Sequence, residues 1–415
     1  MEAEMRRAAG VLLPVSSLPN SGPIGTFGRE AFSFVDFLAD CGFSFWQVLP
    51  LERFGNGDSP YDCRDAFAGE LSYCTSSIQG NYGNRTFSPY QVDYEAAREF
   101  SAEATREQFE TEWLELRKHA NDKGIQLIGD LPFYVSESSK DVIEHPDWFN
   151  LNLTSGAPPD YFNPEGQSWG NPTYDWAAMR KSGYSWWCSR IERAMKMYDY
   201  VRLDHFRGFS KFWGISGAGT EAQSGKWYNG PGYPLFQAME KRLGKLPIIA
   251  ENLGDIDSAV RELLAKAGFP GMAVFQFGFT GERSERPANI HLPHNYRPNL
   301  AAYSGTHDNT TLLDWVMKLD DDSRWDLFAY LGYSGDFTRG GRDCTINKAI
   351  LRSLFQSPSK LVIVPLQDIL GYGADSRLNI PGTATGNWRW RVTQDGLNEI
   401  DRDYWKNQLR LFNRI

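Results

Sequence analysis

Several ionisable residues end an apolar segment at residues 200–208, which has the sequence YVRLDHFRG. Side chains alternate between the two faces of a β-strand, so Arg202 and Asp204 are expected to share one face. An arginine at that distance keeps a carboxylate ionised, and a fixed, ionised carboxylate can act as a nucleophile. The alternative is an ion pair that only closes a loop, because charged residues at strand ends are often purely structural.

A second carboxyl group, that of Glu251, follows the apolar run LPIIA. An apolar setting with other carboxylates nearby raises the pKa of a glutamate, which then stays protonated as a general acid. Two carboxyl groups with separated pKa values, about 5–5.5 Å apart, are typical of retaining glycosidases. The pattern therefore predicts a nucleophile at Asp204 and a general acid and base at Glu251.

A third acid, Asp308, follows His307 in the segment SGTHDN. Its carboxylate could bind sugar hydroxyls and strain the ring toward the oxocarbenium ion that forms in glycoside cleavage. Each of the three acids taken alone could be a loop anchor. Three acids at the ends of three apolar runs are harder to explain by stability, because burying a charge without a partner is costly.

Short apolar runs rich in β-branched and aromatic residues recur along the chain and predict eight buried strands. They lie at 10–16, 43–51, 125–132, 200–206, 246–254, 272–279, 300–308 and 361–368. Helical patterns separate most of them, the clearest at 30–40, 109–120 and 312–331. This alternation predicts an α/β fold, namely a (β/α)8 TIM barrel with insertions in the βα loops and no separate C-terminal β-sandwich. In such a barrel the active site lies at the C-terminal ends of the strands, where the three acids stand.

Composition and charge argue against several classes of function. The chain has 415 residues, of which 41% are hydrophobic, and this is enough for a large core. Its net charge of -9 argues against nucleic acid or a membrane surface as a partner. No apolar run approaches the ~20 residues that span a bilayer, and the N-terminus lacks a convincing signal peptide. A cytoplasmic protein is therefore expected.

The five cysteines predict free thiols in a reducing compartment. They are scattered, odd in number and without a C-x-x-C pair, which disfavours both a disulfide framework and a zinc site. The spacing of an EF-hand loop is also missing, so no metal and no cofactor are expected.

Aromatic residues make up 14% of the chain. Several stand beside Gly, Pro or Asn in predicted loops, among them Trp46, Tyr61, Trp169 and Trp388. Exposed rings are good platforms for the apolar faces of sugars, although ordinary packing explains most single aromatic residues.

Twelve segments, in order along the chain, carry a family likeness. They are WQVLPL (46–51), GDSPY (57–61), DAFAG (65–69), IGDLPFYV (128–135), PPDYFNPEGQSWGNPTYDW (158–176), VRLDHFRGF (201–209), PIIAENLG (247–254), FPGM (269–272), LPHNY (292–296), SGTHDN (304–309), PLQDILG (365–371) and RLNIPGT with GNWRWR (377–391). With these segments the chain resembles the amylomaltases, which are 4-α-glucanotransferases, or disproportionating enzymes, of the α-amylase clan. The resemblance covers nearly the whole chain except residues 70–115.

The resemblance implies roles for individual residues of this chain. Asp204 corresponds to the nucleophile, Glu251 to the general acid and base, and Asp308 to the stabiliser of the transition state. The shell around the reacting sugar is implied at Arg202, His307, Tyr61 and Asp130. Residues 158–172 are implied to form a loop over the cleft, with the acceptor side near Gln167, Trp169 and Asn171. Further sugar contacts are implied at Asn379 and His205.

The chain departs from this family between DAFAG (65–69) and the third predicted strand. Family members carry a longer, largely helical insertion there, whereas this chain shows a single evident helix. We therefore expect one catalytic barrel over residues 1–415 with two insertions. A shortened one follows the second strand at 52–115, and another follows the third strand at 136–195 and includes the 158–172 active-site loop.

The implied reaction moves α-1,4-glucan segments from a donor maltodextrin to the 4-hydroxyl of an acceptor glucan by a retaining double displacement. Its partners are maltooligosaccharides and α-1,4-glucans, with no nucleic acid and no membrane, and no oligomeric state is predicted. Two alternatives stay open, namely an α-1,4-glucan hydrolase of the same clan and a non-catalytic glucan-binding relative. The carboxylates do not separate transfer from hydrolysis, which depends on water exclusion and acceptor binding. The absence of a predicted β-sandwich favours transfer, and the presence of all three acids favours catalysis.

Overall fold

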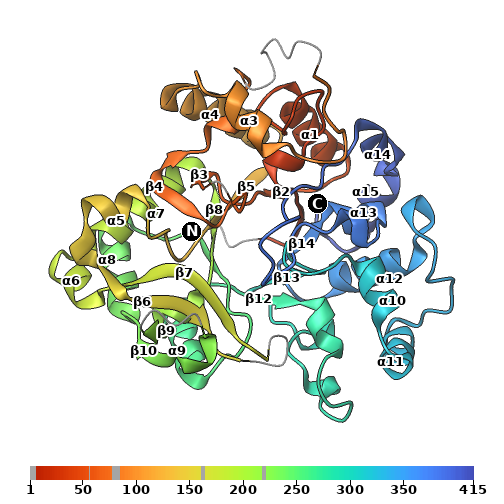
Figure 1. Ribbon diagram of the computed structural model, residues 1–415. Helices are drawn as coiled ribbons and strands as arrows, with labels where there is room; N and C mark the ends of the chain where they lie inside the picture. The colour runs from red at the N-terminus through yellow and green to blue at the C-terminus, as the bar shows by residue number, and fades with distance from the viewer. Residues whose placement is uncertain (1–5, 56, 77–84, 160–163, 217–220) are drawn as a thin grey trace. The chain divides into compact units, whose positions relative to one another are not determined.

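The computed structural model describes residues 6–55, 57–76, 85–159, 164–216 and 221–415 (Figure 1). The chain divides into two compact units. Unit 1 comprises Met1–Leu49, Leu71–Ile128 and Met272–Ile415, and unit 2 comprises Pro50–Glu70 and Gly129–Gly271.

The eight strands predicted from the sequence all form and belong to one sheet, in the order β11-β8-β5-β2-β1-β14-β13-β12. They are β1 (Ala8–Leu12), β2 (Phe45–Gln47), β5 (Gln126–Leu131), β8 (Tyr200–Leu203), β11 (Ile248–Ala250), β12 (Gly271–Val274), β13 (Leu300–Tyr303) and β14 (Leu361–Pro365). The pairs β1–β14, β1–β2, β2–β5, β8–β11 and β13–β14 are parallel. Except for β11 and β12, which stand at the two ends of this order, strands that follow one another in the chain are neighbours, as in a nearly closed (β/α)8 barrel, so the predicted fold class is confirmed.

The strands are shorter than the apolar runs that predict them. The run at 200–206 divides into β8 and a 3₁₀ turn at Phe206–Phe209. The run at 272–279 likewise divides into β12 and a 3₁₀ turn at Phe275–Phe279. Apolar composition continues through these turns because their side chains are also mostly buried, so hydrophobicity alone does not mark where each strand ends.

The helix predicted at 312–331 is wrong in one respect, because two helices take its place. They are α10 (Leu312–Lys318) and α11 (Asp321–Leu331). Leu319 between them has an extended backbone (φ -59°, ψ 142°), and the side chain of Asp320 accepts a hydrogen bond from the N–H of Ser323 (2.8 Å). Asp320 is thus the N-cap of a new helix, a role that aspartate favours.

Unit 1 contains most of the helices. They are α1 (Arg29–Asp40), α3 (Tyr94–Phe100), α4 (Arg106–Asp122), α10, α11, α12 (Thr345–Gln356), α13 (Leu366–Leu370), α14 (Gln394–Glu399) and α15 (Arg402–Leu411). The helix predicted at 109–120 is confirmed as α4, which contacts α1 (Figure 1). It begins at the N-cap Thr105, buries Phe109, Trp113 and Leu116, and is followed by Gly124 with φ 77°. The helix α3 has no counterpart in the prediction.

Unit 2 contains β8, β11 and a second sheet that the sequence does not predict, with the antiparallel order β10-β9-β6-β7 (Figure 1). Its strands are β6 (Phe149–Ala157), β7 (Gln167–Tyr174), β9 (Lys211–Ser216) and β10 (Lys226–Asn229). A hairpin of β3 (Glu52–Phe54) and β4 (Cys63–Gly69) precedes it in the chain. The helices of this unit are α5 (Lys140–Glu144), α6 (Trp176–Lys181), α7 (Ser185–Met197), α8 (Tyr233–Leu243) and α9 (Ser258–Ala267).

All five cysteines are free and buried, which confirms the predicted free thiols. Cys41, Cys74 and Cys344 belong to unit 1, and Cys63 and Cys188 to unit 2. Within the described ranges, no helix combines the length and the apolar composition that crossing a membrane requires.

Candidate active site

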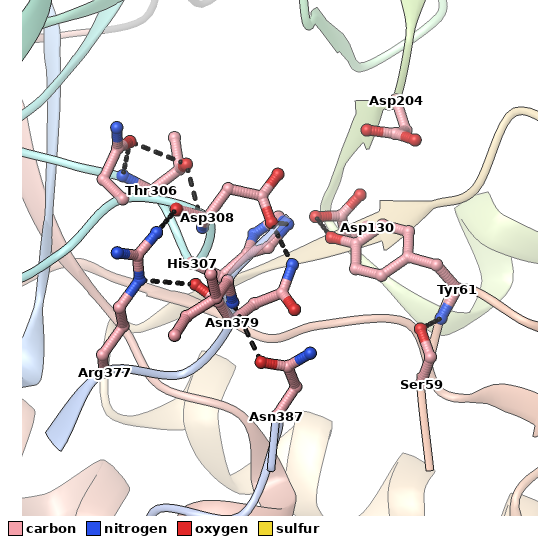
Figure 2. Close-up of polar contacts among 12 residues, drawn as sticks. Ser59, Tyr61, Asp130, Asp204, Thr306, His307, Asp308, Arg377, Asn379 and Asn387 are labelled. Carbon is pink, nitrogen blue, oxygen red and sulfur yellow. Dashed lines mark hydrogen bonds and ion pairs between the residues drawn. The ribbon is translucent and has the colours of Figure 1, made fainter. Parts of the chain in front are cut away.

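Arg202 joins two carboxylates within unit 2. It stands on β8, and its Nη1 donates to both oxygens of Asp130 (2.7 and 2.9 Å) and to Oδ1 of Asp204 (2.9 Å). Asp130, on β5, is fully buried, and the hydroxyl of Tyr61 donates to its Oδ2 (2.9 Å; Figure 2). The contact that the sequence predicts between Arg202 and Asp204 is therefore present, and Tyr61 and Asp130 are brought to the same group.

The backbone turns sharply directly after Asp204. The N–H of Asp204 donates to the carbonyl of Leu131 (3.1 Å), and His205 adopts a left-handed conformation (φ 47°, ψ 48°). This conformation costs a residue other than glycine about 1 kcal/mol. It lets the N–H of His205 donate to Oε2 of Glu251 (2.8 Å), so the end of β8 and the end of β11 are joined through this residue.

Glu251 follows β11 directly and is held by backbone groups. Its own N–H donates to the carbonyl of Leu203 (3.0 Å), and its Oε1 accepts from the N–H of Leu253 (2.9 Å). Burial raises the pKa of Glu251 to about 7, with the charge of Arg202 opposing the rise and that of Asp204 adding to it. The direction of this shift is the one that the sequence predicts, and a carboxyl group of this kind can give and take a proton near neutral pH.

Aromatic rings lie beside this carboxyl pair. The ring of Trp169 lies 5.0 Å from that of His205 and 6.1 Å from that of Tyr134, measured between centroids. The indole N–H of Trp169 donates to Oε1 of Gln167 (3.0 Å), which orients the ring. Burial lowers the pKa of His205 to about 4, so its imidazole is neutral at pH 7 and can either donate or accept a hydrogen bond.

The predicted loop at 158–172 is wrong for its second half, because residues 167–172 belong to β7. This strand pairs with β6, with Gly156 opposite Ser168. Glycine and proline in the segment hide the strand from a pattern search, since both residues are rare in strand interiors. Residues 160–163 lie outside the described residues. Gln167 and Trp169 are joined by their side-chain hydrogen bond, whereas Asn171 follows Gly170 (φ 74°) and a register shift, so strand alternation does not place it on their face.

A second group of predicted site residues lies in unit 1, after β13. The amide of Asn379 donates to Oδ1 of Asp308 (2.6 Å), and Nε2 of His307 lies 3.5 Å from the same oxygen (Figure 2). Arg377 donates to the backbone carbonyl of Asp308 (2.7 Å) and to that of Asn379 (2.6 Å). The side chain of Asp308 remains 46% exposed, whereas His307 is buried beside the ring of Trp388. Both side-chain contacts, those of Asn379 and His307, are made to Oδ1 of Asp308.

Asp368 fixes the segment that carries Asp308. Its Oδ2 accepts from the hydroxyl of Ser304 (2.6 Å), and its Oδ1 accepts from the N–H of Leu312 (2.8 Å). These two contacts bracket the segment, whose last residue, Thr311, is the N-cap of α10. Burial raises the pKa of Asp368 to about 6. Asp368 positions Asp308 without touching it.

Sequence reasoning gave no role to Arg377 or Asp368. Both stand in segments that carry the family likeness, RLNIPGT and PLQDILG, but Arg377 contacts Asp308, and Asp368 contacts Ser304 and Leu312, all of which are distant in the chain. Local pattern therefore could not have revealed them. In the ranges that the structure describes, no group of three or more His, Cys, Asp or Glu side chains is arranged to hold a metal ion.

The chain matches the profile of the family described as 4-α-glucanotransferase over residues 13–111 and 90–397. The two matches overlap at 90–111, inside the segment where the resemblance is predicted to fail. The chain is 34% identical to the 4-α-glucanotransferase of Streptococcus pneumoniae serotype 4 over 504 aligned residues, which cover 99% of this chain and 98% of that protein. It is 35% identical to a chloroplastic or amyloplastic 4-α-glucanotransferase of Arabidopsis thaliana over 512 residues, covering 100% of this chain and 87% of that protein.

The solved structures include a similar chain. An amylomaltase from Streptococcus agalactiae in complex with acarbose has 35% sequence identity and a TM-score of 0.90, covering 99% of this chain and 100% of that one. The alignments with the Streptococcus pneumoniae and Arabidopsis thaliana proteins are longer than the 415 residues of this chain, so those relatives carry segments with no counterpart here.

Proposed function

Because this chain belongs to the 4-α-glucanotransferase family, we propose that it transfers α-1,4-glucan segments from a donor maltodextrin to the 4-hydroxyl of an acceptor glucan. The anomeric configuration is retained, because the reaction passes through a covalent glucosyl-enzyme. The substrates are maltooligosaccharides and longer α-1,4-glucans. The five buried free thiols support a reducing, cytoplasmic location.

One observation carries this proposal, namely the contrast between two carboxyl groups of unit 2. Asp204 accepts a charge-assisted hydrogen bond from Arg202 (2.9 Å), the setting of a nucleophilic carboxylate. Glu251 is buried among backbone donors, and its pKa is raised to about 7, the setting of a proton donor. Retaining glycoside chemistry needs this division of roles.

The reaction proceeds in two steps. Glu251 gives its proton to the glycosidic oxygen while Asp204 attacks the anomeric carbon, so the C–O bond breaks and the leaving glucan departs with a new 4-hydroxyl. Glu251, now a carboxylate, then takes a proton from the 4-hydroxyl of an acceptor, whose oxygen displaces Asp204 from the anomeric carbon. Over the two steps one glycosidic bond is broken and another is formed. The bond between Asp204 and the sugar exists only in the intermediate, so both side chains return to their starting states.

We assign Asp308 to the same active site, as the stabiliser of the transition state. β8, β11 and β13 belong to one sheet, and the three acids follow the C-terminal ends of these strands. Active sites of (β/α)8 barrels are built at those ends. A carboxylate oriented by Asn379 and His307 can hold sugar hydroxyls and favour the positive charge of the oxocarbenium ion.

The remaining residues are assigned to the two sides of the cleaved bond. Tyr61, Asp130 and Arg202 form a connected group that surrounds the donor sugar. Residues of β7 and the turn after β8 are assigned to the acceptor side, where flat rings can stack on a glucose unit. These acceptor-side residues are Gln167, Trp169, Asn171 and His205. The neutral imidazole of His205 suits a sugar hydroxyl, which is both donor and acceptor.

Incubation of the purified protein with maltotriose tests the proposal. Transfer gives glucose and a ladder of longer maltodextrins, while the number of reducing ends stays constant. A steady rise in reducing ends, with only shorter products, would indicate a hydrolase instead. If folded protein bound maltodextrin and left it unchanged, the chain would be a non-catalytic relative. The Asp204→Asn variant is the matched control for contaminating activity.

A further inference from the structure

Two aromatic side chains are exposed on the edge strand β10 of the second sheet. Trp227 and Tyr228 each leave 37% of their surface exposed. On the neighbouring strand β9, Trp213 lies opposite Trp227 and Phe212 lies opposite Tyr228. The indole rings of Trp213 and Trp227 meet at 71° with 5.1 Å between centroids. Because Trp227 and Tyr228 are consecutive, they lie on opposite faces of the sheet, and each face presents one exposed ring beside a ring of β9.

Trp227 is fixed by a buried arginine. The guanidinium carbon of Arg207 lies 3.9 Å from the centroid of the Trp227 ring, a close cation–π contact. The side chain of Arg207 is only 8% exposed, so the arginine belongs to the interior of unit 2. An exposed indole that is stacked on a rigid cation loses little freedom when it binds a ligand, and this favours binding.

Arg207 connects Trp227 to the segments that carry the two carboxyl groups. It lies on the turn Phe206–Phe209, two positions after His205, whose N–H donates to Glu251. Its Nη1 donates to the carbonyl of Asp255, four positions after Glu251, and its Nη2 lies 3.6 Å from the carboxylate of Asp255. Trp227 is therefore supported by the chain segments next to Asp204 and Glu251, and it contacts neither acid.

We infer that Trp227 is a distal glucan subsite, at which a glucose unit remote from the cleaved bond stacks on the indole ring. An α-1,4-glucan is the occupant, because the apolar faces of its sugars match a flat ring and because the supporting segments carry the proposed catalytic carboxyls. The inference rests on the proposed function. The competing explanation is that the indole only shields Arg207 from water.

Chain-length dependence separates these explanations. In the Trp227→Ala variant, KM for maltoheptaose rises about five- to tenfold, the loss of one stacking contact. KM for maltotriose changes much less, because a short chain does not reach the ring. Trp227→Tyr restores most of the affinity for maltoheptaose, since it keeps an aromatic face. Trp227→Met covers Arg207 with an apolar side chain but has no ring, so it behaves like the alanine variant.

Trp325 provides the matched control. It stands on α11 in unit 1, is 65% exposed, and lies 5.6 Å from the guanidinium carbon of Arg283. Trp325→Ala is expected to leave both KM values unchanged. If Trp227→Ala lowers kcat/KM equally for both substrates, or if Trp227→Met behaves like wild type, the indole is only a structural cover and the inference is wrong. Should Trp227→Ala not fold, the comparison of Trp227→Met with Trp227→Tyr decides.

Binding without turnover separates this inference from the proposed function. Calorimetric titration of Asp204→Asn with maltoheptaose measures affinity alone, and adding Trp227→Ala is expected to weaken Kd about fivefold or more. Equal Kd values with and without Trp227 would overturn the subsite. If the wild-type protein does not rearrange maltotriose but Trp227→Ala still weakens binding, the proposed function fails and the subsite stands.

Discussion

The two groups of acids are held by opposite means. In unit 2, Arg202 and backbone N–H groups surround Asp204 and Glu251, which have little freedom to move. In unit 1, a neutral amide and a nearby imidazole orient Asp308, whose carboxylate is almost half exposed. The first arrangement raises the pKa of Glu251 before a substrate arrives. The second leaves a carboxylate accessible, so that charge developing in the substrate can meet it directly.

The contacts of Arg202 explain how unit 2 accommodates several charged side chains in its interior. Burial lowers the pKa of Arg202, but the carboxylates of Asp130 and Asp204 outweigh it and the net change is upward. Asp130 gives the buried guanidinium a fully buried partner of opposite charge, a balance that does not depend on the partly exposed Asp204. The group in unit 1 needs no such balance, because solvent reaches Asp308.

The difference between the two groups of acids predicts that substitution of Asp204 causes the largest loss of kcat. Asp204→Asn removes the nucleophile, so kcat for maltotriose should fall about 10⁴-fold or more. The asparagine keeps an oxygen that accepts from Arg202, so circular dichroism and thermal unfolding should be close to wild type. Transfer near the wild-type rate by a correctly folded variant would remove Asp204 from its assigned role.

Glu251→Gln is expected to have the second largest effect, about 10³-fold in kcat for maltotriose, because protonation of the leaving group is lost. Glucosyl fluoride, whose fluoride leaves with little help from an acid, should show a much smaller loss in the first step. Equal losses on both donors would mean that Glu251 does not protonate the leaving group. The Asp204→Asn variant is the control, since it should fail on both donors.

In unit 1, Asn379→Ala is expected to lower kcat about 10- to 100-fold, because it removes a hydrogen bond to a charged group. Stability should hardly change, since Asp308 is exposed to water. Asn387→Ala is the matched control, because Asn387 is exposed in the same segment and its partners are Ile380 and Thr383. If both variants were fully active, an exposed carboxylate would need no orientation by the protein.

The pH dependence separates the two groups of acids. Glu251 acts as an acid only while protonated, so kcat/KM should fall about tenfold per pH unit above its pKa of about 7. In Glu251→Gln, measured with glucosyl fluoride, this alkaline limb should vanish. Asn379→Ala should keep it, because the unit 1 group does not donate the proton. An unchanged alkaline limb in Glu251→Gln would assign the acid to another residue.

The smallest loss of kcat is expected for a conservative substitution of Asp368. In Asp368→Asn the amide oxygen can still accept from Leu312 and the amide nitrogen can donate to the Ser304 hydroxyl, so kcat should fall only severalfold. Asp368→Ala removes both contacts and should destabilise the protein by about 1–3 kcal/mol. Chemical unfolding and kcat measured on both variants would check this. A large loss of kcat in Asp368→Asn at unchanged stability would give Asp368 a direct catalytic part.

The barrel could be predicted because its strands are buried on both faces and therefore form continuous apolar runs. The second sheet of unit 2 could not be predicted in this way. Its strands β6, β7 and β10 contain polar residues, glycine or proline and are partly exposed, so no apolar alternation marks them. The break between α10 and α11 has a local signal in the aspartates that follow Leu319, but apolar spacing on both sides conceals it.

The sequence singles out the three acids as candidates, because Asp204 and Glu251 directly follow apolar runs and Asp308 closes the short polar segment SGTHD after another. The hydrogen bonds that orient these acids could not be predicted, because they depend on backbone geometry. Nothing in the letters of YVRLDHFRG shows that His205 takes a left-handed conformation and directs its N–H at Glu251. Arg377 and Asp368 could not be predicted for a related reason, since each contacts a backbone group far away in the chain.

The buried cysteines have a practical consequence for following how the protein opens. Burial raises the pKa values of the Cys41, Cys63, Cys188 and Cys344 thiols, and alkylating reagents attack the exposed thiolate. The rate at which each thiol is alkylated therefore reports how often its surroundings open. Peptide mass spectrometry after brief labelling would compare Cys63 and Cys188 with Cys41, Cys74 and Cys344, and so rank the two units by their resistance to local unfolding.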